Sequence, residues 1–345
     1  MKTIYMDNAA TTKTCRAAIN AMVDAMENRY GNPSGLHDEG QLAKETLEEA
    51  RQSIADLLGA KPGEIYFTSG GSEADNQALI SAAKLGEKKG KKHIVSTAFE
   101  HHAVLHTLKK LQKMGFEVEL LPIKNGICVT AEQVKKAIRE DTCLVSVMFA
   151  NNEVGSVMPI AEIGKVCRER GVLFHTDAVQ AVGHVRVNVA EQNIDMLSLS
   201  AHKFHGPKGV GVLYVKKGIL LTNLIEGGGQ ERGKRAGTEN VPGIVNFCFE
   251  GIEGESLLLL LNAKGVCVSS GSACTSSSLL PSHVLLAIGC PKEVAHGSVR
   301  LSLCEENTEE EVDFVLKELP ETVEYLRSIS PVWRDLTEGK TRFLL

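Results

Sequence analysis

Short apolar runs alternate with longer amphipathic stretches through most of this chain, and this alternation restricts its fold more than any other feature. The runs that we predict as strands are Ile65–Phe67, His93–Thr97, Phe116–Leu120, Leu144–Phe149, Val172–His175, Met196–Ser200 and Val210–Val215. The stretches that we predict as helices are Gln41–Leu58, Glu73–Leu85, His102–Met114 and Ile160–Arg170. Alternating strands and helices form βαβ units, so we predict an α/β fold with a mostly parallel sheet flanked by helices.

The pattern changes at Glu250, after which strands and helices no longer alternate regularly. We expect a short apolar helix at Leu257–Leu261, a strand at Val299–Leu303 and an amphipathic helix at Thr308–Arg327, which begins like a capping box. These elements predict a second, smaller α+β domain. The domains that we predict are a large one at 15–245, a small one made of 1–14 and 246–330, and a tail at 331–345 that extends the fold or docks.

Composition excludes several functional classes. The 345 residues suffice for a large and a small domain, and 43% hydrophobic with 23% charged residues is ordinary for a soluble globular protein. A net charge of −5 favours no nucleic-acid partner, and no apolar run approaches the roughly 20 residues of a membrane span. The N-terminal residues turn polar too early for a secretory signal. We therefore expect a cytoplasmic protein without nucleic-acid or membrane partners.

The cysteines indicate reduced thiols rather than disulfides or zinc ligands. There are nine, an odd number, with no CxxC pair and no regular spacing, so we expect no bound metal. The cysteines that fit the description of small buried apolar residues are Cys143, Cys167, Cys248, Cys267 and Cys304.

Polar residues follow the carboxyl ends of most of the predicted strands, where ligands bind in parallel sheets. They are Ser69–Ser72, His101, Asn151–Asn152, Asp177 and Lys203. Because unrelated polar residues would not all gather at one sheet edge, we expect a ligand site there.

Lys203 is the strongest single candidate. It lies between His202 and His205, after the apolar run Met196–Ser200 and before a Gly/Pro turn. A lysine that is partly desolvated there loses its proton more easily, as an amine must before it forms a Schiff base. Most lysines are solvated instead, as we expect for Lys208 in the following turn.

Asp177 completes the minimal pair for pyridoxal 5′-phosphate (PLP) chemistry, an amine for the aldehyde and a carboxylate for the pyridinium nitrogen. Its alternative role is to cap a helix from Ala178, the commoner function of such an aspartate. Gln180, one turn further on, is placed to reach the ring hydroxyl of the cofactor.

The stretch Thr68–Glu73 joins a strand to a helix and is rich in small residues, Gly71 and Ser72 among them. Backbone N–H groups at such a helix start can surround a phosphate, although a plain glycine-rich turn explains the pattern equally well. His101 can stack on a pyridine ring or serve as a helix cap, whereas His102 and His106 are expected to be structural.

Cys274 differs from the other cysteines because glycine, serine and threonine surround it. An accessible thiol in such a loop can react as a thiolate. A cysteine-protease interpretation would need a histidine partner and an oxyanion hole, which nothing nearby provides, and it leaves Lys203 and Asp177 unexplained. Arg300, in a predicted strand, can bind an α-carboxylate with two hydrogen bonds or form a surface ion pair.

Motifs along nearly the whole chain resemble those of one family. They are Tyr5–Thr12, Gly31–Ser34, Phe67–Gly70, Glu100–His102, Asn151–Gly155, His175–Asp177, Ala201–Lys203, Gly227–Gly233, Arg235–Asn240, Ser269–Cys274 and His296–Arg300. The chain resembles the cysteine desulfurases of the NifS/IscS type, which are class V aminotransferase-like PLP enzymes with the aspartate-aminotransferase fold. The Ser-Ser-Gly-Ser-Ala-Cys form of the loop is similar to the branch that serves iron–sulfur cluster assembly.

The resemblance implies a role for each candidate. Lys203 carries PLP and moves the Cα proton, Asp177 pairs with the ring nitrogen, and His101 stacks on the ring. Cys274 attacks the sulfur of L-cysteine, which leaves alanine and a persulfide for an iron–sulfur scaffold or other acceptor protein. Ser72, Ser200 and His202 hold the phosphate, and Gly71 also binds the cofactor. Gln180 and Asn152 lie near the ring oxygen and the substrate, and Arg300 holds the substrate carboxylate. Thr238 reaches the phosphate of the cofactor in the other subunit of a homodimer.

One departure from the family pattern bears on the small domain. Family members have several tens more residues between the stretches that match Gly243–Val245 and Phe249–Glu255. The resemblance therefore implies a shortened small domain. Two alternatives remain open: a related PLP lyase or aminotransferase such as a selenocysteine lyase, and an inactive, dimeric PLP-binding remnant.

Overall fold

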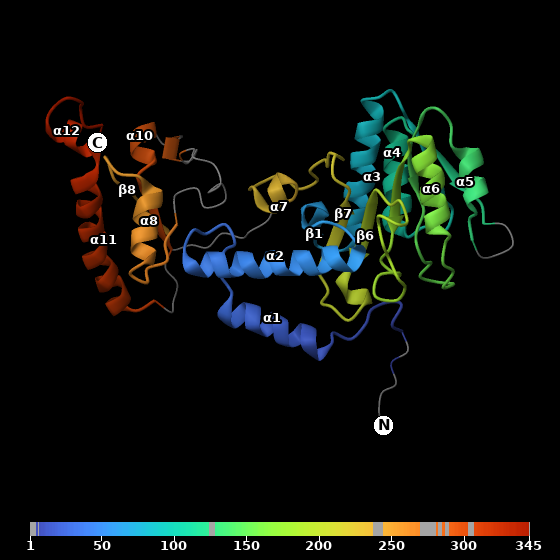
Figure 1. The fold of residues 1–345 in the computed structure, drawn as a ribbon, viewed down its shortest axis with the longest axis horizontal. Coiled ribbons are helices and arrows are strands. Elements are labelled where there is room, and N and C mark those ends of the chain that lie inside the picture. Colours follow the sequence, from blue (N-terminus) through green and yellow to red (C-terminus); the bar gives the residue numbers. More distant parts are fainter. Residues whose placement is uncertain are drawn as a thin grey trace. The chain divides into compact units, whose positions relative to one another are not determined.

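The computed structural model describes residues 5, 7–123, 128–236, 244–269, 281, 285–286, 290–302 and 307–344 (Figure 1). The chain divides into two compact units, which are described separately. The first comprises Met1–Val23, Glu48–Gly227 and Glu231–Ala236, and the second Asp24–Leu47, Gly228–Gln230 and Gly237–Leu345. These units follow from contacts within the chain, and the domain bounds predicted from the sequence remain a prediction.

A seven-stranded sheet forms the centre of the first unit. Its strands are β1 (Ile65–Thr68), β2 (His93–Thr97), β3 (Glu117–Leu121), β4 (Thr142–Ser146), β5 (Leu173–Asp177), β6 (Met196–Ser200) and β7 (Gly211–Val215). Their spatial order is β1-β7-β6-β5-β4-β2-β3. The neighbouring strands β6, β5, β4, β2 and β3 are all parallel to one another. In this sheet, β7 runs antiparallel to its two neighbours, β1 and β6. The prediction of a mostly parallel α/β sheet is confirmed.

Helices and two apolar clusters cover the sheet on both faces. The helices in or entering the first unit are α1 (Arg16–Asn28), α2 (Asp38–Leu58), α3 (Gly71–Glu87), α4 (His102–Lys113), α5 (Ala131–Ala137) and α6 (Ile160–Arg170), with 3-10 turns η1 (Pro62–Glu64) and η2 (Ala201–Lys203). Neighbouring strand residues enter opposite clusters: Ile94 packs with Leu79 of α3, and Val95 with Ile163 of α6. Both neighbours are fully buried, which explains the nearly continuous apolar strand sequences.

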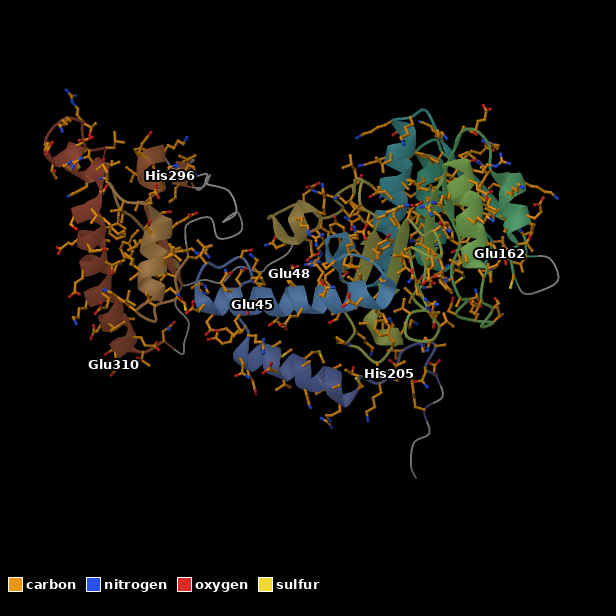
Figure 2. The ribbon with its side chains drawn as sticks, viewed as in Figure 1. Glu45, Glu48, Glu162, His205, His296 and Glu310 are labelled. Carbon is orange, nitrogen blue, oxygen red and sulfur yellow. The ribbon has the colours of Figure 1, made fainter. Side chains whose placement is uncertain are left out.

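Helix α6 shows why the amphipathic pattern was readable. Ile163 and Cys167 are buried, whereas Glu162 is exposed (Figure 2). The helix ends at Gly171, whose φ of 64° is the left-handed conformation that favours glycine at a helix C-terminus. The predicted bounds, Ile160–Arg170, match the observed ones.

The second unit holds a two-stranded antiparallel sheet of β8 (Ile244–Cys248) and β9 (Ser298–Ser302). Its further helices are α8 (Gly254–Asn262), α10 (Lys292–Ala295), α11 (Glu309–Ile329) and α12 (Pro331–Thr337), while the short helix α7 (Gln230–Gly233) has one residue in the second unit and three in the first. The predicted capping box is present, because the Thr308 side chain accepts a hydrogen bond from the backbone N–H of Glu311 while that glutamate accepts one from Thr308 N–H. In the tail, the Trp333 ring lies 3.8 Å from the Arg327 guanidinium.

Two expectations about this part of the chain need correction. Cys267 is exposed and Cys248 is half-buried, so neither is a fully buried apolar residue, whereas Cys143 and Cys167 are buried as expected. Burial raises the pKa of the Cys143 thiol to about 11. Cys304 lies outside the described residues. No helix in the described ranges is both long enough and apolar enough to cross a membrane.

Candidate active site

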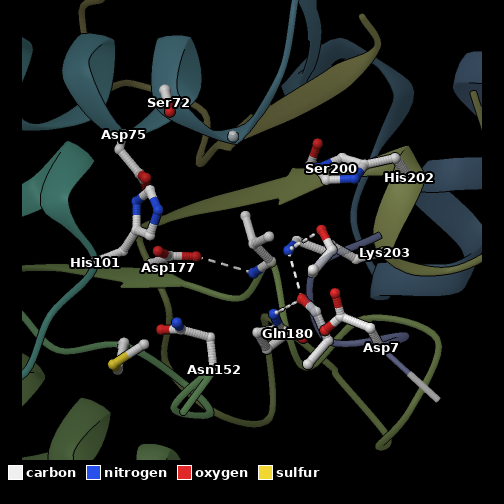
Figure 3. A pocket seen from close by; sticks show the side chains of 15 residues that line it. Asp7, Ser72, Asp75, His101, Asn152, Asp177, Gln180, Ser200, His202 and Lys203 are labelled. Atoms are coloured by element: carbon white, nitrogen blue, oxygen red, sulfur yellow. Dashed lines mark hydrogen bonds between the residues drawn. The ribbon is translucent and has the colours of Figure 1, made fainter. Parts of the chain in front are cut away.

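A cavity of about 430 Å³ lies at the carboxyl ends of the parallel strands in the first unit (Figure 3). This volume is within the usual range for small-molecule sites. The residues that line it are Asp7, Ala9, Ala10, Gly71, Ser72, Asp75, His101, Met148, Asn152, Asp177, Val179, Gln180, Ser200, His202 and Lys203. The structure thus brings nine of the predicted site residues together, although their chemical roles remain predictions.

Lys203 ends η2, directly after β6, and its amine reaches into the cavity. Its Nζ donates hydrogen bonds to the carbonyl oxygens of Ala9, at 2.6 Å, and Ala10, at 2.8 Å. Burial lowers the pKa of Lys203, and the negative charges of Asp177 and Asp7 oppose that change. The neutral amine required for Schiff-base chemistry is therefore easier to reach than on an exposed lysine.

Asp177 is the last residue of β5 and is only 4% exposed. Its Oδ1 accepts a hydrogen bond of 2.9 Å from the backbone N–H of Val179. Residues 179–184 form turns and no helix begins at Ala178, so the alternative of a helix cap from Ala178 is wrong. Burial raises the pKa of Asp177, while the Val179 N–H, His101 and Lys203 act in the opposite direction.

His101 combines the two roles considered for it. It is the N-cap residue of α4, where its Nδ1 accepts a hydrogen bond of 3.1 Å from the N–H of Ala103. Its ring also lines the cavity (Figure 3). The cap fixes the ring at the cavity wall, so the same residue is available to stack on a flat ligand.

The part of the cavity beside the start of α3 is suited to an anion. Helix α3 begins at Gly71, and the N–H groups of a first helical turn have no carbonyl partner within the helix. A Cβ on Gly71 would lie 2.6 Å from Cγ2 of Val179, so the close approach requires glycine. Ser72, Ser200 and His202 line the same cavity, and His202 Nδ1 lies 3.1 Å from Thr11 Oγ1.

The N-terminal segment is a part of the site that sequence reasoning missed. The backbone N–H of Thr12 donates to the carbonyl oxygen of His202 at 2.8 Å, and Gln180 Nε2 donates to Ala9 O at 2.8 Å. The segment thereby holds Lys203 through main-chain carbonyls, which no side-chain pattern could reveal. The only signal was the motif Tyr5–Thr12, to which no role was given.

Asp75 was missed as well. It lies one helical turn after Ser72 on α3, is 1% exposed and lines the cavity. The available signal was a carboxylate among small apolar residues such as Ala74 and Ala78 in the predicted helix. Asn151 was a candidate site residue but is not among the residues that line the cavity. Its side chain accepts a hydrogen bond from Glu153 N–H in its own loop and donates one to Phe99 O.

Three predicted residues are not part of this description. Cys274 and Thr238 lie outside the described residues. Arg300 belongs to the second unit, on β9, where its backbone pairs with that of Ser269. Its buried Nε has no hydrogen-bond partner among the described residues. The roles of these three residues stay predictions.

Glu100, beside the cavity wall, gives a prediction about pH. Its Oε1 accepts hydrogen bonds from Thr97 Oγ1 and Met148 N–H, and burial raises its pKa to about 8. The folded protein therefore holds an extra proton between the ordinary carboxyl pKa and about 8, so stability is fully present below that window and falls as pH rises through it. We expect Glu100→Gln to flatten the decline in melting temperature between about pH 5 and pH 8.

Glu140→Gln serves as the matched control, because Glu140 is exposed. The measurement is the melting temperature of the wild type, Glu100→Gln and Glu140→Gln across that pH range, and Glu140→Gln should keep the slope of the wild type. Equal slopes for Glu100→Gln and the wild type would show that Glu100 is not protonated in the fold.

The comparisons with known proteins agree with this fold. The aminotransferase class-V family model matches residues 4–245 and 221–315. A protein from Clostridium botulinum strain Hall named cysteine desulfurase IscS is 46% identical over 393 positions, covering 98% of this chain and 99% of that protein. A protein of the same name from Methanosarcina thermophila is 47% identical over 382 positions, covering 96% of this chain and 94% of that one.

Solved structures give the same result. A NifS-like protein superposes with a TM-score of 0.66 at 34% identity, covering 94% of this chain and all of that chain. A structure titled SspA in complex with cysteine superposes with a TM-score of 0.65 at 35% identity, covering 87% of this chain and 99% of that one. The fold is that of PLP-dependent enzymes of fold type I. The chain belongs to the aminotransferase class-V family and, within it, to the cysteine desulfurases of the NifS/IscS type.

The comparison also bears on the departure near Val245. The alignment with the Clostridium protein runs over 393 positions, more than the 345 residues of this chain, so that relative has residues that this chain lacks. The first of the two family matches ends at residue 245, where the sequence indicates the missing segment. In the structure this join lies inside β8, which pairs with β9 across it.

Proposed function

We propose that this protein is a PLP-dependent cysteine desulfurase, which converts L-cysteine to L-alanine and places the sulfur on Cys274 as a persulfide. The observation that carries the proposal is the convergence of Lys203, Asp177 and His101 on one cavity with the N-terminus of α3. Relatives that cover nearly the whole chain are named cysteine desulfurases, and one solved relative is titled as a complex with cysteine.

The residues of the cavity fit PLP. A buried carboxylate, Asp177, lies at one end for the ring nitrogen, and the ring of His101 provides a flat surface. The first turn of α3 with Ser72, Ser200 and His202 provides N–H and hydroxyl donors for a phosphate. When bound, PLP would supply an electron sink that stabilises negative charge at the substrate Cα.

The protein's own groups would then divide the work. Lys203, whose pKa burial lowers, would hold the cofactor and move the Cα proton. Asn152 and Gln180 would lie beside the cofactor oxygen and the substrate, and Arg300 would bind the substrate carboxylate. The Cys274 thiolate would attack the substrate sulfur: an S–S bond forms, the Cβ–S bond breaks, and the electron pair left on Cβ takes up a proton to give alanine.

Three further parts of the proposal come from the family resemblance. Thr238 would reach the phosphate bound by the other subunit, so the active form would be a homodimer. The sulfur acceptor would be an iron–sulfur scaffold or a related protein, met in the cytoplasm. The serine- and glycine-rich sequence around Cys274 suits a loop that must meet both substrate and acceptor.

The direct test is to incubate the purified, PLP-supplemented protein with L-cysteine and to quantify alanine and the mass of the Cys274 peptide. We expect alanine together with a persulfide on that peptide. Bound PLP without alanine would leave the inactive remnant as the better description. Alanine without a persulfide on Cys274 would favour a lyase that does not use the loop thiol.

A further inference from the structure

Asp75 is the residue of the cavity to which neither the sequence nor the proposed reaction gives a role. It is 1% exposed and projects from α3 toward the cavity wall that holds His101 and Asp177 (Figure 3). One carboxylate oxygen of Asp75, a ring nitrogen of His101 and one carboxylate oxygen of Asp177 all lie within 4.8 Å of one another. Two buried carboxyl groups therefore share one small space.

The groups on the other side of Asp75 are neutral. Oδ1 of Asp75 lies 3.6 Å from Nε2 of His175, and the side chain hydrogen-bonds with Ser198. His175 is itself completely buried, with Nδ1 2.9 Å from Ser146 Oγ and Nε2 3.1 Å from Ser198 Oγ. Burial lowers the pKa of His175 to about 3, so this imidazole carries no charge at neutral pH.

No lysine or arginine in the described part of the chain forms an ion pair with Asp75. The charged and titratable groups that face the pair are His175 on β5, Glu100 and His101 at the start of α4, and Lys203 on η2. Glu100 adds a further buried carboxyl rather than a compensating positive charge.

Two buried carboxylates this close cannot both be ionised without a compensating cation, so one of them keeps a proton. The two are not equivalent. Asp177 accepts the Val179 N–H bond and lies near His101 and Lys203, and all three favour its ionised form. Asp75 lies beside the neutral His175 and Ser198, and its Oδ1 has no hydrogen-bond partner among the described residues.

We infer that Asp75 is a positioning residue that stays protonated and acts through Asp177: its neutral carboxyl group next to Asp177 leaves the single negative charge on Asp177, which faces the ring nitrogen of PLP. This inference rests on the proposed function, because PLP is the ligand whose ring nitrogen the Asp177 carboxylate would face. Helix α3 would then have two roles, binding the phosphate at its first turn and keeping the negative charge on Asp177. Both tasks arise from one helical turn, Ser72 to Asp75.

Asp75→Asn tests the inference, because asparagine copies the shape of a neutral carboxyl group. We expect the variant to bind PLP with a dissociation constant within about twofold of wild type, measured by the absorbance of the protein–PLP complex. Asp177→Asn should weaken PLP binding by about tenfold or more. Asp75→Ala should also weaken it, and its melting temperature without PLP shows whether the fold survives.

Infrared spectroscopy shows directly which of the two carboxyl groups carries the proton. The difference spectrum between wild type and Asp75→Asn should contain the band of a protonated carboxyl group, with and without PLP, and the difference between wild type and Asp177→Asn should contain that of an ionised carboxylate. A carboxylate band lost in Asp75→Asn, or a tenfold loss of PLP affinity in that variant, would overturn the inference. Failure of the wild type to bind PLP would instead refute the proposed function, while the spectra without PLP would still locate the proton.

Discussion

Lys203→Ala is expected to abolish alanine formation from L-cysteine, with a rate on the order of 10³-fold or more below wild type, because the variant lacks both the amine that holds PLP and the group that moves the Cα proton. The absorbance that PLP acquires on this lysine should disappear as well. The fold should remain, since the hydrogen bonds of the Lys203 amine within the described residues go to the carbonyl oxygens of Ala9 and Ala10.

Lys208→Ala is the matched control. Lys208 lies five residues further along the chain and is exposed, so its loss should leave both the spectrum and the rate close to those of wild type. Alanine formation by Lys203→Ala at a rate near that of Lys208→Ala would contradict the role given to Lys203. Melting temperatures of both variants separate loss of function from loss of folding.

Cys274→Ser is expected to keep the PLP spectrum and to lose alanine formation by on the order of 10²-fold or more, because a hydroxyl group is a poor nucleophile for sulfur at neutral pH. No persulfide should form at position 274. The measurement is alanine release under steady-state conditions, together with the mass of the peptide that contains residue 274.

Cys267→Ser provides the control for this variant, since Cys267 is an exposed cysteine seven residues earlier. It should retain full activity. If Cys274→Ser kept most of the activity on the preferred substrate, the related lyase interpretation, such as a selenocysteine lyase, would replace the desulfurase.

The sheet and the position of its ligand site were predictable because both follow from local patterns. Buried parallel strands such as Met196–Ser200 are apolar along their whole length, and α6 alternates between buried and exposed faces. The carboxyl ends of such strands meet at one edge, so Asp177 and Lys203 could be placed together without coordinates.

What escaped prediction depends on contacts between distant parts of the chain. The N-terminal segment holds Lys203 through backbone carbonyls, which have no side-chain signature. Asp75 gained significance only when α3 brought it within reach of Asp177. The short strand β8 was not among the predicted strands, and its pairing with β9, which lies far from it in the sequence, emerged only from the structure.

The measurement that tests the central claim most directly is to treat the PLP-supplemented protein with borohydride, digest it and find the peptide that carries the cofactor by mass spectrometry. Borohydride makes the bond between PLP and its amine permanent, so the modified residue identifies the cofactor lysine. We predict that the modification lies on Lys203. Adding L-cysteine before borohydride should lower the amount of modified Lys203 peptide. A modification on another lysine, or none on a protein supplied with PLP, would contradict the assignment of this cavity as the PLP site.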